Sequence, residues 1–312
     1  MPKLTRKRTI LLKTESSYGS DPSPTGSANA VLVRDLNIEP IQSDEVSRDL
    51  IRGYLGNYDV LLANQRVNVT FDVEMAGSGT AGTEPHYSPA LKACGLAVTT
   101  VSSTSNTYAP VSSSFGSCTI YVNIDGVNHA VTGARGTFSI NCSVNNIPVI
   151  SFNMTGKYNA PADVTLPTCT YQKQADPVIF KNSNVTGFEI FGTSLALQSW
   201  TFDMNNDVIY RELVGSTATK EVLITDRKPS GSLSVEAPAL SAKNFFTIAT
   251  GTATGTNTFT YHTVAGKKVQ ISCPQTDVST PTYEDSEGVV LLSLPFNALP
   301  SSGNDELSIK YF

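Results

Sequence analysis

A chain of 312 residues is too long to fold comfortably around one hydrophobic core, so we expect two lobes of about 150 residues each. Only 16% of the residues are charged, and Ser, Thr, Asn, Gly and Val are plentiful, which favours strands and turns over helices. The formal net charge is −5, but five bases lie within the first thirteen residues, so the remainder carries 17 bases against 27 acids. That remainder repels nucleic acid non-specifically, and no apolar run has the length of a membrane span, so we expect a soluble protein.

The predicted elements begin after the basic N-terminal arm, residues 1–13, which we expect to be a disordered, solvated terminus rather than a binding site. A strand pattern at 29–39 is followed by a long polar segment at 40–57. The clearest strand is 67–75, where apolar and polar residues alternate, so one face of it is buried. Its apolar positions are Val67, Val69, Phe71, Val73 and Met75.

The next element is a helix at 86–94, where Ser88 can cap, Pro89 suits the first turn and Gly95 ends the helix. A second, shorter helix is predicted at 241–249. A Pro-rich segment at 161–177 reads as a linker. The remaining strand patterns lie at 117–124, 128–131, 136–144, 148–154, 187–203, 256–262, 267–273, 288–295 and 306–312.

Two internal echoes indicate a duplication. Residues 59–76 and 221–238 lie 162 positions apart and share an acid, Val-Leu and a closing Val-Glu. Residues 129–142 and 262–273 share His, Val, Gly, Ile and Cys when a two-residue gap is allowed, at an offset of 133, so the second copy has lost material between the echoes. We therefore predict a first lobe at 1–162, a linker at 163–177 and a second, diverged lobe at 178–312.

No catalytic, cofactor or metal constellation stands out. Gly77, Gly79 and Gly82 form a GxGxxG after a strand, but no helix pattern follows, which favours a flexible turn over a dinucleotide site. The three histidines and five cysteines lack metal-ligand spacing, and no serine nucleophile motif occurs. Acids near the C-terminus, including Asp285, are typical of solvated loops. We expect reduced, buried cysteines, no catalytic, cofactor-binding or metal residues, and no enzyme.

Several short motifs keep a characteristic order along nearly the whole chain. They are LLKTESSYG at 11–19, Tyr87–Gly95, Tyr108–Pro110, Gly133–Gly136, Gly156–Tyr158 and DELSIKYF at 305–312. In this order they resemble the tail tube proteins of long-tailed, non-contractile bacteriophages. The resemblance implies a mainly β fold of two tandem tail-tube-like β-sandwich or split-barrel lobes, each with a short helix.

The resemblance also implies a structural virion protein that assembles, in the cytoplasm of the bacterial host, into stacked trimeric rings with pseudo-hexameric symmetry. The genome would pass through the resulting tail tube without specific DNA binding. Expected partners are further copies of the chain, a tape-measure protein, and tail terminator and distal tail proteins. A different class stays open at this point: a duplicated β-sandwich binding module, such as a tail-tip or adhesin component.

Two sets of residues are candidates for these roles. Asp72, Glu74 and Glu236 occupy the polar side of predicted strands and would line the lumen, where acids repel phosphates; an outer surface or ring interface is the competing assignment. The segment 40–57 matches the family's ring-stacking loop, although a disordered loop is also consistent with its length. Its charged residues, which suggest contacts that set the ring register, are Asp44, Glu45, Arg48, Asp49 and Arg52.

Overall fold

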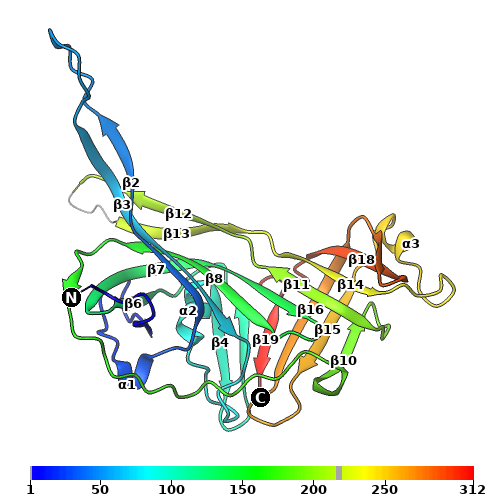
Figure 1. Ribbon diagram of the computed structural model, residues 1–312. Coiled ribbons are helices and arrows are strands. Elements are labelled where there is room, and N and C mark those ends of the chain that lie inside the picture. Colours follow the sequence, from blue (N-terminus) through cyan, green and yellow to red (C-terminus); the bar gives the residue numbers. More distant parts are fainter. Residues whose placement is uncertain (1, 216–219) are drawn as a thin grey trace.

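The computed structural model describes residues 2–215 and 220–312, and its mainly β fold confirms the predicted fold class (Figure 1). The helices are α1 (Gly26–Asn29), α2 (Ser88–Ala93), the 3-10 helix η1 (Asn182–Asn184) and α3 (Phe245–Ala249). The N-terminal half, residues 2–163, holds strands β1 (Arg8–Thr14), β2 (Arg34–Ser47), β3 (Val60–Glu74), β4 (Leu96–Val101), β5 (Ser105–Pro110), β6 (Cys118–Ile124), β7 (Val127–Ser143), β8 (Val149–Lys157) and β9 (Ala162–Asp163). The C-terminal half, residues 178–312, holds strands β10 (Val185–Ile190), β11 (Leu197–Asp203), β12 (Asn206–Glu212), β13 (Lys220–Arg227), β14 (Ser230–Glu236), β15 (Gly255–Tyr261), β16 (Val269–Val278), β17 (Thr282–Ser286), β18 (Val289–Ala298) and β19 (Ser308–Tyr311).

The N-terminal half folds as two antiparallel sheets that share the long strand β7. The first part of β7 pairs with β6, which pairs with β1, and the second part pairs with β8, which pairs with β3 and then β2. The register of β7 shifts between Thr132 and Arg135, where Gly133 adopts a positive φ of 60°, so the strand can leave one sheet and enter the other. Phe71, Phe138 and Phe152 pack together in the core beneath the second sheet.

The C-terminal half repeats this order of pairing. Strand β10 pairs with β15, which pairs with β16. Strands β16 and β17 both pair with β18, β18 pairs with β14, and β14 pairs with β11. The core here is built around Trp200, whose ring stacks on Phe202 and contacts Phe259 and Phe296. The two halves therefore present the same arrangement of strands, the second with β16 and β17 in place of the single strand β7.

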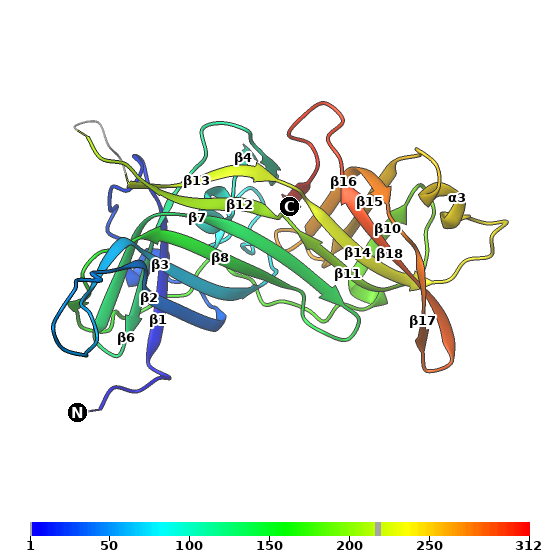
Figure 2. The same ribbon diagram turned by 90° about the horizontal axis from the view of Figure 1, so that it is seen from above.

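One antiparallel sheet runs through both halves, because β7 pairs with β8 on one side and with β11 on the other. We call it the shared sheet, in the order β2-β3-β8-β7-β11-β14-β18-β17 (Figures 1 and 2). A second junction joins β5 to the C-terminal strand β19, where Tyr108 meets Tyr311 edge to face at 5.6 Å. Two separate sets of strand pairs thus hold the halves together within one chain.

Two long hairpins extend from the shared sheet. The β2–β3 hairpin continues beyond the body of the protein and projects from it (Figure 1). The β12–β13 hairpin is the extension of β11 and β14, and it lies across the N-terminal half (Figure 2).

Several predicted elements need correction. The basic arm is not a disordered terminus throughout: Arg8–Thr14 forms β1, with Ile10 and Leu12 buried. Segment 40–57 is strand as far as Ser47, and 187–203 is two strands separated by residues 191–196. The helices at 86–94 and 241–249 are confirmed, each shorter than predicted.

The two sequence echoes behave differently in the structure. The first is in register, because Thr70 in β3 and Ser232 in β14, 162 residues apart, hold equivalent positions between β2 and β8 and between β11 and β18. The second is not, because His129 lies inside β7 whereas His262 follows the end of β15. The residues that the second echo aligns are therefore not structurally equivalent, although both segments belong to strands of the two halves.

Candidate assembly surfaces

The polar face of the shared sheet is continuous across both halves. Alternate side chains of each strand are buried in the core, and those between them point to the opposite face. One row of directly paired residues on this face reads Arg34, Asp72, Ser151, Ser139, Asp203, Ser230 and Asn297. The next row reads Glu74, Val149, Asn141, Thr201, Ser232 and Pro295. Hydroxyl, amide and carboxylate groups dominate, and Arg34 is the one base in these rows.

The structure places Asp72, Glu74 and Glu236 on this one face. Asp72 and Glu74 lie two positions apart on β3, and Glu236 ends β14 beyond Ser232. A guanidinium nitrogen of Arg34 lies 3.6 Å from a carboxylate oxygen of Glu74, with both side chains partly exposed. Such an exposed pair contributes little to stability, so the two residues keep most of their charge available to solvent.

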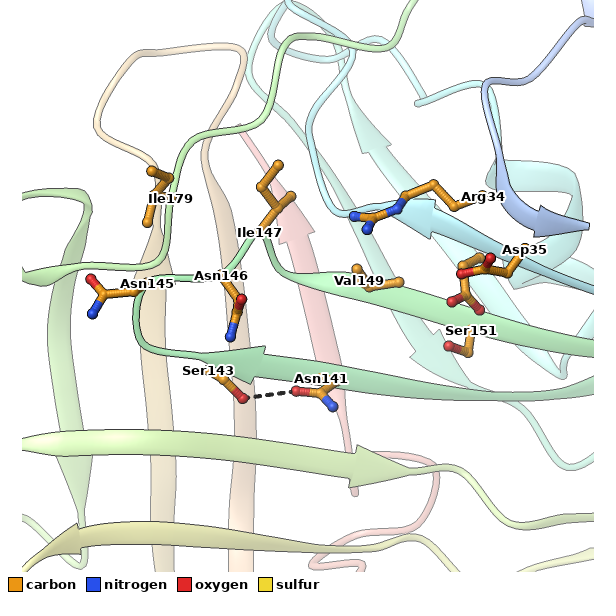
Figure 3. A pocket seen from close by; sticks show the side chains of 11 residues that line it. Arg34, Asp35, Asn141, Ser143, Asn145, Asn146, Ile147, Val149, Ser151 and Ile179 are labelled. Atoms are coloured by element: carbon orange, nitrogen blue, oxygen red, sulfur yellow. Dashed lines mark hydrogen bonds between the residues drawn. The ribbon is translucent and has the colours of Figure 1, made fainter. Parts of the chain in front are cut away.

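A groove opens on the polar face where β7 turns into β8 (Figure 3). Asp72, Asn141 and Ser151 contribute side chains from the sheet, and Asn145 and Asn146 contribute from the turn. Within it the Ser143 hydroxyl donates a hydrogen bond to the Asn141 side-chain oxygen at 3.1 Å. The lining combines neutral polar side chains with two acids, Asp35 and Asp72, and Arg34 is the one base among the lining residues, so they form no cluster of bases that would hold a phosphate.

The projecting part of the β2–β3 hairpin carries exposed apolar side chains at its end. Ile51 and Leu55 are fully exposed, at 102% and 103% of their reference areas. The other exposed apolar residues near the end of this hairpin are Val46, Leu50, Tyr54, Val60, Leu61 and Leu62. We call these eight residues the apolar tip. A monomeric soluble protein rarely concentrates so many large apolar side chains at one exposed point, which marks the tip as an interaction surface.

The charged residues predicted for stacking bond mostly within the hairpin itself. Arg66 lies 3.4 Å from the Asp44 carboxylate, and Arg48 lies 3.7 Å from that of Asp59. The Ser47 hydroxyl donates to Asp49, the Arg52 guanidinium lies over the Tyr58 ring at 5.0 Å, and Glu45 is exposed opposite Leu62. These contacts brace the hairpin. The exposed apolar side chains of the same segment were not among the residues singled out from the sequence.

The β12–β13 hairpin also combines ion pairs with exposed apolar side chains, but its surroundings differ. Ion pairs join Arg211 to Glu221 and Lys220 to Glu212 across the strands. Ile209 and Leu213 are exposed along this hairpin, and Val214 near its end is fully exposed, at 104% of its reference area. Unlike the β2–β3 hairpin, its base is attached to the N-terminal half by a buried network of polar side chains.

That network begins at Glu15, a buried carboxylate within the LLKTESSYG motif. It accepts hydrogen bonds from the Ser117 and Thr119 hydroxyls at 2.6 and 2.7 Å, and from the Gly19 and Gly133 backbone N–H groups, each at 2.7 Å. Four donors compensate the loss of water around a buried charge. The carboxylate thereby holds two family motifs, more than a hundred residues apart in sequence, against each other.

Arg135, from the second of these motifs, extends the network to the C-terminal half. Its guanidinium donates to the carbonyls of Gly116, Phe115 and Val222 at 3.1, 3.0 and 2.8 Å, and lies 4.6 Å from the centre of the Tyr18 ring. The Val222 N–H in turn donates to the Tyr18 hydroxyl at 2.6 Å. Burial raises the pKa of Tyr18 to about 12, so the phenol stays neutral. Tyr18 and Arg135 thus fix strand β13, and sequence reasoning missed both because nothing local indicates a contact with Val222.

The glycine-rich turn also joins the two halves rather than binding a ligand. The Gly79 N–H donates to the Gly266 carbonyl at 3.0 Å, and a Cβ on Gly77 would lie 2.5 Å from the same oxygen. Glycine is needed at position 77 because the two backbones approach so closely. The turn predicted to be flexible is therefore packed against the connection between β15 and β16.

The remaining candidates show no sign of chemistry. Within residues 2–215 and 220–312, no group of His, Cys, Asp and Glu is arranged to hold a metal ion. Burial raises the pKa of the thiols of Cys94, Cys118, Cys142 and Cys273, as expected of buried cysteines, whereas Cys169 is only half-buried. Over the same described ranges, no helix has the length and apolar character needed to cross a lipid bilayer.

A comparison with protein families decides what this arrangement belongs to. The family model described as "Phage tail tube protein" matches residues 5–298, nearly the whole chain. The chain belongs to the phage tail tube protein family. It is thus a structural component of the phage tail, as the motifs at 11–19 and 133–136 suggested. A search of curated proteins finds no match for this tail tube protein.

Proposed function

We propose that this tail tube protein forms rings of three chains that stack into a tube for passage of the genome during delivery to the host. Each chain would contribute two tail-tube lobes, 1–162 and 178–312, joined by the linker at 163–177, so that six similar lobes surround the bore. The observation that carries the proposal is the shared sheet. It already continues from one half to the other through β7 and β11, and the same strand order occurs in each half.

The polar face of the shared sheet would line the lumen. Asp72, Glu74 and Glu236 would add negative charge to a surface of hydroxyl and amide groups. Such a lining binds phosphates weakly, because it offers few bases to replace the counterions of DNA. The buried face of the same sheet packs on the cores of both halves, which leaves the polar face free for the bore.

The β2–β3 hairpin would join successive rings. Its apolar tip would bury side chains such as Ile51 and Leu55 on the neighbouring ring, each contributing about 2 kcal/mol on full burial. The charged residues Asp44, Arg48 and Asp49 would keep the hairpin rigid, and Glu45 and Arg52 would contact polar groups of the next ring. In this proposal the apolar tip supplies the attraction between rings, and the charged residues set the shape and register of the contact.

Other tail proteins would meet the tube at defined places. A tape-measure protein would occupy the bore during assembly, and tail terminator and distal tail proteins would cap its two ends. Assembly would take place in the cytoplasm of the bacterial host. None of these partners requires chemistry from the chain, so the proposal includes no catalytic step.

Negative-stain electron microscopy of the purified protein, alone and with its tape-measure protein, tests the proposal. We expect rings in which six lobes surround a central hole, and tubes built from these rings. Class averages viewed along the tube axis should show three-fold symmetry. A protein that stays monomeric at high concentration under both conditions would contradict the proposed function.

A further inference from the structure

The shared sheet ends in two strands that have a free edge. Among the described residues, β2 pairs only with β3, and β17 pairs only with β18. All but one residue of β17 are exposed, as are Arg34, Asn37 and Glu39 of β2. Free edges invite pairing with another strand, and a protein that does not cover them is prone to association.

The junction between the halves shows how two such edges fit together. Strand β11 pairs with the end of β7: Thr201 lies opposite Asn141, and Asp203 opposite Ser139. In the repeated order of strands, β2 occupies the place of β11, because Asn37 pairs with Thr70 as Thr201 pairs with Ser232.

Strand β17 likewise occupies the place of the end of β7. Thr282 pairs with Ser293 of β18 just as Ser139 pairs with Ser151 of β8. Glu284 therefore corresponds to Asn141, and Tyr283 to Ile140. The chain thus carries both sides of the β7–β11 junction a second time, but on strands that have no partner in the same chain.

We propose that β17 of one chain pairs antiparallel with β2 of a second copy, with Asn37 opposite Glu284, Ile38 opposite Tyr283 and Glu39 opposite Thr282. This inference rests on the proposed ring and names the strands that close it. The partner is a second copy of this chain, because the strand that β2 lacks at its free edge is supplied by β17 of another copy, and the strand that β17 lacks is supplied by β2.

The hydrogen-bonding phase of the β7–β11 junction shows what this register requires. At the β7–β11 junction, the Met204 N–H donates to the Phe138 carbonyl and the Val144 N–H to the Gln198 carbonyl, each at 3.0 Å. Hydrogen-bonded pairs alternate in antiparallel strands, so Thr201 and Asn141 form a non-hydrogen-bonded pair. The same must hold for Asn37 and Glu284 if the second junction copies the first.

The geometry of the β17–β18 turn independently gives the hydrogen-bonding phase of β17. Glu287 and Gly288 both have positive φ, 53° and 85°, as in a two-residue hairpin turn. The flanking residues Ser286 and Val289 then form a hydrogen-bonded pair, so Glu284 directs its backbone groups towards β18. Tyr283 and Asp285 direct theirs outward, and they are the residues that the proposed register pairs through hydrogen bonds.

Charge complementarity favours the same arrangement. Arg8 donates to the Leu36 carbonyl at 2.8 Å, so a base lies at the free edge of β2. The register places Asp285 opposite Leu36, within reach of that guanidinium, and β17 carries no base. In the free chain Arg8 covers an edge carbonyl; in the ring it would also bind the incoming carboxylate.

Disulfide trapping tests the register. In a Cys169→Ser background, which removes the one cysteine that is not fully buried, the variant Asn37→Cys with Glu284→Cys is assembled and then oxidised. Non-hydrogen-bonded pairs bring the Cα atoms to about 4.5 Å, within the range for a disulfide. We expect crosslinked dimers and trimers on non-reducing gels, with nothing larger, at a yield at least ~10-fold above either single-cysteine variant.

The matched control is Asn37→Cys with Thr282→Cys, which shifts the pair by two residues on the same face. Rings that crosslink through this control, or that form without crosslinking through Asn37 and Glu284, would overturn the register while leaving the tube proposal intact. Absence of rings in the unmodified protein would instead overturn the proposed function.

A charge exchange adds a readout that does not need cysteine. Arg8→Asp and Asp285→Arg should each reduce ring formation in sedimentation at least ~5-fold, and the double variant should restore it. Single variants that assemble normally, or a double variant that fails while staying folded by circular dichroism, would argue against this junction.

Discussion

The two hairpins of the shared sheet have the same origin in the fold but different surroundings. The two strands of the β2–β3 hairpin stay paired with each other up to its apolar tip, through register shifts between Glu39 and Asp44 and a positive φ of 52° at Asn64. The hairpin of the C-terminal half is interrupted at Asn205, which has a positive φ of 47° and whose amide bonds the Lys228 carbonyl. Beyond this bend the Asn206 amide donates to the carbonyls of Cys94 and Gly136, so the hairpin lies on the N-terminal half.

The difference shows which contacts one chain can satisfy alone. The β12–β13 hairpin finds Tyr18 and Arg135 in its own chain and is fixed by them. Among the described residues, no comparable buried network surrounds the apolar tip of the β2–β3 hairpin. In the proposed tube, the surface that the tip contacts would belong to another copy. The exposed Ile51 and Leu55 of the tip are therefore best explained by contacts made between chains.

The largest effect is expected from changing the apolar tip. Ile51→Asp with Leu55→Asp should abolish tubes, because two charges would replace apolar side chains at the contact between rings. Folding should be unaffected, since both side chains are fully exposed in the free chain. Electron microscopy and analytical ultracentrifugation would show single rings or free chains in place of tubes.

The matched change on the other hairpin is Ile209→Asp, at a side chain that is 41% exposed. If the two hairpins differ as described, this variant should still form tubes. Tubes formed by the tip variant, or tubes lost equally in both, would contradict the distinction.

The second prediction concerns the fixed hairpin. Arg135→Met keeps the length of the side chain but removes the donor to three carbonyls and the cation beside Tyr18. We expect a loss of about 3 kcal/mol in the free energy of unfolding, measured by chemical denaturation. Hydrogen exchange should accelerate at Val222, whose N–H bonds Tyr18.

Arg48→Met provides the comparison on the projecting hairpin. Its partner Asp59 is exposed, and pairs of this kind contribute about 0–1 kcal/mol. Equal losses in the two variants would mean that the network around Arg135 does not stabilise the fold.

How much the sequence could predict depended on whether one face of a strand is buried. Strand β3 was predicted from Val67 onward, where alternation is strict, but not at Val60–Leu62, where successive side chains are all exposed. Strand β1 was missed because its bases mask a short buried run at Ile10–Leu12. Alternation of apolar and polar residues thus indicates a strand with one buried face, and strands that are exposed on both faces show little alternation.

The candidate surfaces were also predictable only in part. Alternation alone was enough to place Asp72, Glu74 and Glu236 on polar faces. That these faces form one surface could not be predicted, because it depends on the pairing of β7 with β11, strands more than fifty residues apart. The Arg135 network likewise depends on a register between halves that no local pattern encodes.

The third prediction concerns the polar face. Asp72→Lys with Glu236→Lys should leave rings and tubes intact but lower DNA delivery at least ~10-fold, because lysines in the bore would bind phosphates. Glu74 is left unchanged, since it pairs with Arg34 beside the proposed junction. Plating efficiency and potassium efflux on infection would measure delivery.

The control for this prediction is Asp163→Lys with Glu189→Lys, exposed positions on β9 and β10 outside the shared sheet. It makes the same change in net charge. A delivery defect of the same size in both variants would place the effect in overall charge rather than in the lumen, and failure of assembly in the first would place Asp72 or Glu236 at an interface.

The smallest effect is expected on the pH dependence of stability. Burial lowers the pKa of His86 in the N-terminal half and of His262 in the C-terminal half, and nearby Lys173 and Lys267 lower them further. The unfolded chain then binds protons at a higher pH than the folded chain does. Stability should therefore be constant above the ordinary histidine pKa of about 6.5 and fall as the pH drops below it towards the folded values.

His262→Asn separates this titration from structure. The His262 Nδ1 accepts hydrogen bonds from the N–H groups of Thr263 and Val264 at 2.9 and 3.0 Å, and the residue has a positive φ of 68°. Asparagine offers an acceptor at the same place and tolerates this backbone conformation. Stability at pH 7.5 should be nearly unchanged, while the loss between pH 6.5 and 5 should shrink relative to the parent. A variant that loses stability equally at both pH values would show that the ring of His262 acts through packing and that its protonation does not control the fold.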